Sequence, residues 1–292
     1  MPFSNPDVFV YVLGIMQDAG LPHVGCRCVR CAAAFINPAL AQYATAIAIV
    51  DSRTLPAQVW LVDVTPDVRY QLNLLAPWLG FHPQRAARLR PPDGIFLTHA
   101  HMGHVGGLNQ LGPEGMFIQN VPIYGTPPML DLLWQENLLR PLLSACHLRS
   151  LLPDYALTLA PDLSITPLLV PHRDEARTGT LAFHIQGPHK SLLYLPDIDH
   201  WSAWPEARTT IGQVDMALLD ASFFSVDELG GRPPVAHPLV VETLETFAGI
   251  PTQIILTHFN HTNPLLDEAS AAQQMVAAAS ITLAYTGQRL AL

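Results

Sequence analysis

The sequence has few charged residues, few cysteines and no long apolar run. Charged residues make up 13% of the 292 residues, whereas hydrophobic residues make up 49%. This composition excludes an intrinsically disordered chain, which combines low hydrophobicity with high charge. The longest apolar runs have the length of a strand, such as Val8–Leu13, and a membrane-spanning helix needs about 20 apolar residues. We therefore expect a compact chain without a membrane span.

Basic residues are also scarce, with 15 lysines and arginines against 24 aspartates and glutamates and a formal net charge of -9. Non-specific binding to nucleic acid or to anionic lipid needs a basic surface, so both partners are excluded. The first seven residues lack the basic segment that opens a secretory signal. We expect a cytoplasmic protein that binds a small-molecule substrate. The sequence is compatible with a homodimer.

Only four cysteines are present, and three of them, Cys26, Cys28 and Cys31, lie within six residues. Such crowding does not suit disulfides between distant loops. The Cys-x-Cys-x-x-Cys spacing lets three thiolates surround one tetrahedral zinc ion, while Arg27 and Arg30 offset their charge. A fourth ligand is then needed, and a cluster of free thiols is the alternative. The isolated Cys146 is expected to be a small residue of the core.

Short apolar segments alternate irregularly with helix-like segments along the chain. The apolar segments have strand length and are rich in β-branched residues, and several helix-like segments open with proline in the first turn. We predict strands at Val8–Leu13, Ala44–Val50, Gln58–Val64, Gly94–Thr98, Ile165–Val170, Thr180–Ile185, Ser191–Leu195, Met216–Leu219 and Gln253–Thr257, and helices at Pro66–Leu79, His104–Leu111, Met129–Leu139, Pro238–Phe247 and Leu265–Ala279.

Turn residues predict how these segments are connected. Gly187–Lys190 reads as a hairpin turn, and Tyr285–Gly287 is predicted to form another, so the sheets should be mixed. The 27 prolines are spread along the chain instead of forming a linker. We predict one α/β domain over residues 1–292, built from two stacked mixed sheets.

Three histidines follow the predicted strand Gly94–Thr98 in the segment His-Ala-His-Met-Gly-His. In an extended loop, residues two apart point the same way, so His99 and His101 can bind one ion. His104 enters the next predicted helix and can face a neighbouring ion. The apolar strand and the small neighbouring residues favour a metal site over a surface histidine run.

This segment resembles the signature of the metallo-β-lactamase superfamily, His-x-His-x-Asp-His on the loop after a strand. The resemblance implies an αββα sandwich, in which helices flank two mixed sheets, and three later ligands that each follow a strand. His172, Asp197 and His258 stand at such positions. The resemblance implies that His99, His101 and His172 form one metal site, that Asp197 bridges, and that His104 and His258 form the second site.

The sequence departs from the signature at Gly103, where the superfamily has an aspartate. In the superfamily this aspartate binds the second metal and orients the nucleophilic water. Its absence bears on both the second metal and ordinary hydrolysis. Five imidazoles and one carboxylate suit one or two ions of zinc, iron or manganese.

Over nearly its whole length the chain resembles two branches of the superfamily, pyrroloquinoline quinone biosynthesis protein B and the cyclic phosphodiesterase of phosphonate breakdown. Both carry the cysteine segment after the first strand. In the phosphodiesterase branch a histidine three residues after the last active-site histidine completes a structural zinc site, which implies His261 here. The segments Leu21-Pro22, Asp220–Phe224 and Asn260–Pro264 are more similar to the quinone branch. The full histidine motif departs from that branch and indicates a side group.

Some further residues are weaker candidates. Asp220 ends a predicted strand and could orient a ligand histidine, or it could be a simple turn residue. His237 matches a histidine of the quinone branch and could reach the site, or it could lie on the surface at a helix start. Asp220 and His237 are therefore candidate catalytic residues, together with Asp197 and His104. The residues that could line the pocket are Asp18, His23, Arg173 and His200.

Three functions follow from these features. The leading hypothesis is a hydrolase whose metal-activated water attacks an ester, amide, lactone or phosphodiester, with His104 and Asp197 holding the second metal or acting on the water. No Gly-x-Ser-x-Gly nucleophile motif competes with it. The alternative is an iron-dependent oxygenase or oxidase, which the quinone branch implies and for which Gly103 would leave open coordination for O₂. The third hypothesis is a metal-binding protein without catalysis.

Overall fold

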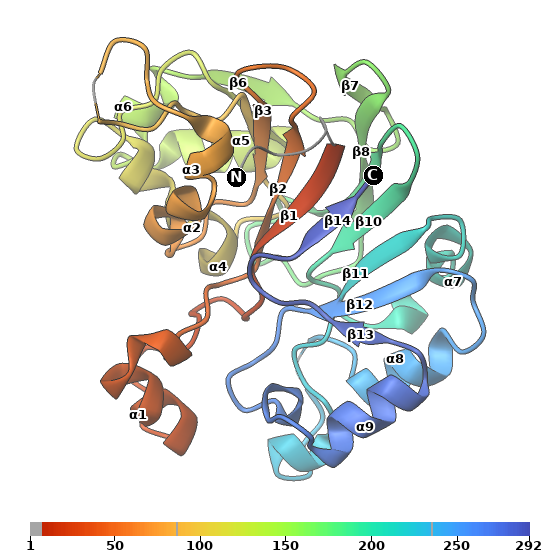
Figure 1. Cartoon of the computed structure of the whole chain (residues 1–292). Helices are drawn as coiled ribbons and strands as arrows, with labels where there is room; N and C mark the ends of the chain where they lie inside the picture. Colours follow the sequence, from red (N-terminus) through yellow and green to blue (C-terminus); the bar gives the residue numbers. More distant parts are fainter. Residues whose placement is uncertain (1–7, 86, 235) are drawn as a thin grey trace.

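The computed structural model describes residues 8–85, 87–234 and 236–292, which form two seven-stranded sheets stacked face to face (Figure 1). In the first sheet the order is β14-β1-β2-β3-β4-β5-β6. The strands β14, β1, β2 and β3 are antiparallel, and β3 to β6 are parallel. Their bounds are β1 (Val8–Gly14), β2 (Ala46–Asp51), β3 (Gln58–Val62), β4 (Gly94–Phe96), β5 (Pro122–Gly125), β6 (His147–Ser150) and β14 (Arg289–Ala291).

The second sheet has the order β13-β12-β11-β10-β9-β8-β7. Strands β10 to β13 are parallel and β7 to β10 are antiparallel. Both sheets are therefore mixed, as the sequence predicted. The bounds are β7 (Leu157–Ala160), β8 (Leu163–Val170), β9 (Thr180–Gln186), β10 (Ser191–Leu195), β11 (Met216–Asp220), β12 (Gln253–Thr257) and β13 (Thr282–Leu283).

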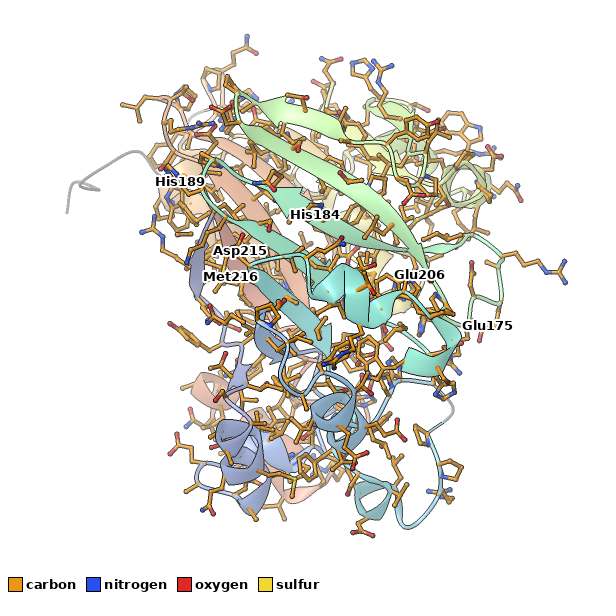
Figure 2. All side chains as sticks on the ribbon, turned by 90° about the vertical axis from the view of Figure 1, so that its right-hand side faces the viewer. Glu175, His184, His189, Glu206, Asp215 and Met216 are labelled. Atoms are coloured by element: carbon orange, nitrogen blue, oxygen red, sulfur yellow. The ribbon has the colours of Figure 1, made fainter. Side chains whose placement is uncertain are left out.

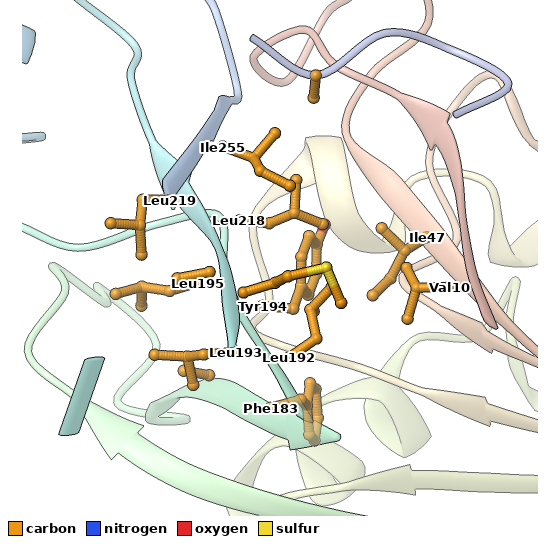
Figure 3. Packing of buried hydrophobic residues seen from close by; sticks show 14 of the residues in the cluster. Val10, Ile47, Phe183, Leu192, Leu193, Tyr194, Leu195, Leu218, Leu219 and Ile255 are labelled. Carbon is orange, nitrogen blue, oxygen red and sulfur yellow. The ribbon is translucent and has the colours of Figure 1, made fainter. Parts of the chain in front are cut away.

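The main core lies between the two sheets. Val10 of β1 and Ile47 of β2 face Tyr194 and Leu218 of the second sheet across it (Figure 3). Side chains alternate along β1, so Phe9 points the other way and packs in a second apolar cluster against the helices. Every residue of β10 is buried, because this strand is covered on both faces.

Helices cover the outer faces of both sheets and complete the αββα architecture (Figure 1). Helices α2 (Val68–Leu74) and α3 (Ala76–Leu79) contribute buried residues to the cluster outside the first sheet. Helices α7 (Ala207–Ile211), α8 (Val240–Thr246) and α9 (Ala271–Ala278) lie on the second sheet. The remaining helices are α1 (Val29–Ile36), which lies apart from the sheets, α4 (Met102–Val105), α5 (Pro127–Gln135) and α6 (Arg140–Leu143).

The predicted strands are all present with small shifts at their ends, but the predicted helices are too long. Pro66–Leu79 is two helices because Pro77 lies in the first turn of α3. His104–Leu111 divides into α4 and a short 3₁₀ helix, Leu108–Leu111. Helix α5 ends at Gln135 instead of Leu139. In place of Leu265–Ala279, a 3₁₀ turn precedes α9, which begins after the capping residue Ser270.

The two predicted hairpin turns have different outcomes. Gly187–Lys190 joins the antiparallel strands β9 and β10, and Gly187 N donates to Lys190 O at 3.0 Å. The prediction of a hairpin at Tyr285–Gly287 was wrong. The segment does turn, but β13 before it pairs in the second sheet and β14 after it pairs in the first. Five strands were not predicted, namely β5, β6, β7, β13 and β14, and each of them has at most four residues.

None of the helices in the described ranges combines the length and the apolar character that crossing a bilayer requires.

Candidate metal centre

The histidines and carboxylates of the predicted centre come from the carboxyl ends of strands in both sheets. The loop after β4 carries His99 and His101 and runs into α4, which carries His104. The parallel strands β10, β11 and β12 end together at one edge of the second sheet. Asp197 follows β10 by two residues, and His258 follows β12 directly. Two sheets therefore direct side chains into one buried space.

His99, His101 and His172 form the first group. One nitrogen from each of these three imidazoles lies within 4.8 Å of the others. His172 Nε2 is 3.4 Å from His101 Nδ1. The other nitrogen of His101, Nε2, is 3.3 Å from Glu175 Oε2, which extends from the loop at the far right of the second sheet in Figure 2. In the same view, Asp215 and Met216 mark the opposite, amino end of β11. The grouping is the one that the superfamily resemblance implied for the first metal.

The carboxylate of Asp197 lies between this group and the histidines of the second. Its Oδ2 is 3.0 Å from His104 Nε2, 3.4 Å from His258 Nε2 and 4.0 Å from His99 Nε2. Its Oδ1 is 3.7 Å from His172 Nε2. This is the position that a bridging carboxylate would need, while its role as a ligand stays a prediction.

His104 and His258 form a second group, with Asp18 as its third member. Asp18 belongs to the turn after β1, and the sequence placed it only at the edge of a pocket. His237 and Asp220 also lie here, because ligand atoms of Asp197, Asp220, His237 and His258 approach one another within 4.8 Å. His237 is 6% exposed, so its alternative reading as a surface residue was wrong.

Hydrogen bonds to the Nδ1 atoms orient three of the imidazoles. Asp63 Oδ2 is 2.7 Å from His104 Nδ1, and Asp220 Oδ2 is 2.7 Å from His237 Nδ1. Ser222 Oγ lies 2.9 Å from His258 Nδ1 and donates to Asp220 Oδ1. Such contacts leave the Nε2 atoms of His104 and His258 directed at the centre.

Charge and burial set the protonation of the group. Burial opposes the charge of Asp197, but His258, His104 and His99 outweigh it and hold the pKa of this carboxyl well below its usual value. Burial and the neighbouring His104 lower the pKa of His99 well below its ordinary range. Burial also acts on His104, but Asp63 and Asp197 raise its pKa well above normal. The centre therefore combines an ionised Asp197 and a neutral His99, which are the forms that bind metals, with a protonated His104, which would lose its proton on becoming a ligand.

Unpaired buried atoms test whether these residues fit a metal. His99 Nε2 and His258 Nε2 are buried and have no hydrogen-bond partner in the described part of the chain. A buried polar atom left unpaired costs about 1–3 kcal/mol. These two atoms face the same space as Asp197 Oδ2, which pairs with His104 Nε2 at 3.0 Å. A cation would satisfy them together, and the imidazole and carboxylate donors suit zinc, iron or manganese. The residues present therefore fit the metal that the sequence predicts.

The cysteines gather with His261 at a separate place. Ligand atoms of Cys26, Cys28, Cys31 and His261 lie within 4.8 Å of one another. His261 Nδ1 is 3.7 Å from Cys28 Sγ and 3.9 Å from Cys26 Sγ. Cys28 caps α1, where the backbone N–H of Cys31 lowers its pKa, while burial raises the pKa of Cys31 to about 11. Three sulfurs and one nitrogen are a common tetrahedral zinc set.

Three other residues named from the sequence lie near the cysteine cluster or at the surface. Arg30 donates to the carbonyl of His261 and lies 2.8 Å from Asp267 Oδ1, so it holds the histidine loop. The ring of His23 lies 4.7 Å from that of His261, beside the cysteines. His200 is exposed.

The other candidates lie close to their expected places. Arg173 lines a pocket beside His237, and Cys146 is half-buried against the apolar cluster outside the first sheet.

Sequence reasoning missed the residues that orient the histidines. Asp63 directly follows β3, which pairs in parallel with β4, and its carboxylate accepts hydrogen bonds from the Thr98 backbone and hydroxyl. Asp199 Oδ1 lies 3.1 Å from His172 Nδ1, an ion-pair distance but without hydrogen-bond geometry. An aspartate at the end of an apolar strand was the available signal for Asp63. For Ser222 and Asp199 the sequence contained no such signal, except that each lies two residues after a candidate aspartate, Asp220 or Asp197.

The comparisons with known proteins agree with this geometry. Residues 59–259 match the family model of the β-lactamase superfamily domain. The chain belongs to this superfamily. Among curated superfamily members, it is 28% identical to coenzyme PQQ synthesis protein B of Methylobacterium sp. (strain 4-46), across 96% of this chain and 99% of that protein. It is also 28% identical to the protein of that name from Cupriavidus necator, across 97% and 99%.

Solved structures of the superfamily show the same fold. Zn²⁺-bound PqqB from Methylobacterium extorquens superimposes with a TM-score of 0.81 at 23% identity, covering 97% of this chain and all of that one. A diphosphatase of the PhnP family superimposes with a TM-score of 0.70 at 21% identity, covering 98% and 97%. The resemblance stated from the sequence is confirmed, as is the αββα fold class.

Proposed function

We propose that this protein is a metal-dependent hydrolase that uses a metal-activated water on an ester, amide, lactone or phosphodiester. The observation that carries the proposal is the placement of Asp197. Its carboxylate lies between the group of His99, His101 and His172 and the group that contains His104 and His258. That arrangement suits two neighbouring ions.

The chemistry divides between the metal and the chain. A bound divalent ion lowers the pKa of its water toward neutrality and polarises the bond that is attacked. Asp63 and Ser222 keep the Nε2 atoms of His104 and His258 directed at the centre. Asp220 holds Nδ1 of His237, whose other nitrogen is 3.3 Å from Gln17 Nε2. Because both His237 and Gln17 line a pocket, a substrate there could take the place of Gln17 at this nitrogen.

A pocket beside His237 supports a small substrate with a negative charge. Its volume is 410 Å³, which lies within the roughly 300–1,000 Å³ of small-molecule sites. Arg173 and Arg232 line it together with Phe223 and Gln17. Two guanidinium groups next to an apolar ring favour a phosphodiester or a carboxylate-bearing ester over a neutral amide.

We propose further that Cys26, Cys28, Cys31 and His261 bind a structural zinc ion. His261 lies three residues after His258, so this ion would fix the loop that carries a ligand of the centre. Arg30 holds the same loop through the His261 carbonyl and Asp267.

His101→Ala tests the proposed hydrolase. We expect this variant to lose active-centre metal, measured by elemental analysis of protein purified without added metal, and to lose hydrolysis of a panel of phosphodiesters, esters and lactones. The matched control is His189→Ala, since His189 lies in the turn between β9 and β10, distant from the centre (Figure 2). Active wild-type protein whose turnover survives His101→Ala would contradict the proposal.

An iron-dependent oxygenase is the second candidate, and the similarity to coenzyme PQQ synthesis protein B along 96% of the chain favours it. The argument from an open coordination position at Gly103 is weaker in the structure, because Asp18 occupies the adjacent space. Iron in the purified protein and substrate-dependent oxygen consumption would support this candidate. Metal binding without either reaction would support the third hypothesis, a non-catalytic metal-binding protein.

A further inference from the structure

Gly103 stands where the superfamily signature has a carboxylate, yet the space beside it is filled. A Cβ atom built on Gly103 would lie 2.3 Å from Asp18 Oδ1 and 2.5 Å from Asp18 Cα. Real Cβ atoms do not approach other atoms so closely. Asp18 therefore occupies the volume that a side chain at position 103 would use.

Asp18 reaches this volume from a different part of the chain. It lies in the turn after β1, whereas Gly103 lies in α4. Its carboxylate is within 4.8 Å of the ligand nitrogens of both His104 and His258. Among the described residues this carboxylate has no hydrogen bond or ion pair, although its charge helps to raise the pKa of the nearby His237. An acidic oxygen beside two imidazoles is thus free to bind a cation.

Backbone contacts hold the turn firmly against the centre. Gln17 N donates to Phe259 O at 2.9 Å, and Phe259 N donates to Ile15 O at 2.8 Å. Phe259 directly follows His258, so the turn and this ligand loop are joined. Gly20 closes the turn with a φ of 68°, in a region that favours glycine, and its N donates to Gln17 O. The position of Asp18 is therefore built into the fold.

We propose that Asp18 supplies the carboxylate ligand of the second metal position, together with His104 and His258, in place of the aspartate that Gly103 lacks. The ligand is a divalent cation with a preference for nitrogen and oxygen donors, such as zinc or manganese. Gly103 is then a requirement of this arrangement, because any side chain there would displace Asp18. The proposal rests on the metal-binding part of the proposed function and is independent of the reaction.

Asp18→Ala and the near-isosteric Asp18→Asn test the proposal directly. We expect both to bind one zinc equivalent fewer than wild type after dialysis against metal-free buffer. The affinity of the second metal position for zinc should fall by at least about tenfold. Losses of this size occur even when only a residue that hydrogen-bonds to a ligand is removed. Asp18→Glu, which retains a carboxylate, should recover part of the binding.

Circular dichroism confirms that the variants fold, and Asp67→Asn is the matched control. Asp67 accepts from Ala44 N beside the turn and belongs to neither ligand group.

Gly103→Ala provides a second, independent test, because it removes no ligand atom. We expect it to lower the occupancy of the second position as Asp18→Ala does, since the added methyl group must displace the Asp18 turn. The double variant should lose no more affinity than either single variant, because all three lack the same contact.

The outcomes separate this inference from the hydrolase proposal. Wild-type zinc content and affinity in both Asp18→Ala and Asp18→Asn would overturn the inference, whatever the activity. Loss of one equivalent in these variants, with no hydrolysis by the fully loaded wild type, would uphold the inference and contradict the hydrolase proposal.

Discussion

Three residues of the centre have a strained backbone. Asp63, His237 and His258 have φ values of 72°, 73° and 63°, in the left-handed region that costs residues with a side chain roughly 1–2 kcal/mol each. In each case the side chain makes a hydrogen bond within the centre. Positive φ values also occur elsewhere in the described chain, for example at Asn120 and Asp162, but at these three residues the hydrogen bonds of the centre hold the strained backbone in place.

Asp220→Asn tests the positioning role of this carboxylate. Asp220 is fully buried and holds both His237 Nδ1 and the Ser222 hydroxyl. The amide keeps the shape but loses the charge, so we expect metal affinity to fall by about 10- to 100-fold while the protein stays folded. Competition with a chelator measures the affinity. The matched control is Asp215→Asn at the amino end of the same strand, and equal losses in both variants would contradict the role.

The candidate histidines could be named from the sequence because they follow apolar strands and because the superfamily resemblance implies ligands at such positions; the structure brings them together. The sequence did not predict Asp63, whose partner His104 lies 41 positions away. That contact depends on the parallel pairing of β3 with β4, which no local pattern encodes. Asp18 was underestimated for a similar reason, since a glycine at position 103 gives no indication of which distant residue fills its space.

At the scale of elements, strands were easier to predict than helices. Buried strands in this chain are continuous apolar runs, and their limits follow from composition. Helix ends depend on tertiary contacts. The helix predicted at His104–Leu111 is interrupted at Gly107, where a Cβ would lie 2.0 Å from the Thr65 carbonyl oxygen. Only after folding does this close approach exist, so periodicity could not predict the break.

Cys28→Ser tests the link between the loop after β1 and the loop that carries His258. We expect the variant to lose the cysteine-bound zinc and to unfold at a lower temperature. We also expect weaker metal binding at the centre, because His261 would no longer fix the neighbouring His258. Elemental analysis and thermal unfolding measure both effects. Cys146→Ser makes the same chemical change outside the cluster and should keep its zinc. Unchanged zinc content and unfolding temperature in Cys28→Ser would refute the link.

For the whole molecule, the centre connects the two sheets. His99, His101 and His104 come from the first sheet, whereas His172, Asp197 and His258 come from the second. A bound ion would therefore hold the layers together in addition to the apolar core between them. Metal binding and global stability should be coupled.

Removal of metal tests this coupling. We expect dialysis against a chelator to lower the midpoint of thermal unfolding, and added zinc to raise it again in a concentration-dependent way. An ion present at 100 times its dissociation constant adds about 2.7 kcal/mol to the free energy of unfolding. His101→Ala should show a smaller response than wild type. Identical unfolding curves for stripped and reloaded wild-type protein would contradict the coupling.

The closeness of Asp18 to Gly103 constrains how these two positions can change during evolution. If the two positions share one carboxylate, an ancestor could not change them independently, because an aspartate at both would collide and an aspartate at neither would leave the metal short of a ligand. Natural homologues should then fall into two groups, one with a carboxylate at position 103 and another with glycine there and aspartate at position 18. A motif search that demands the first pattern would discard working members of the second.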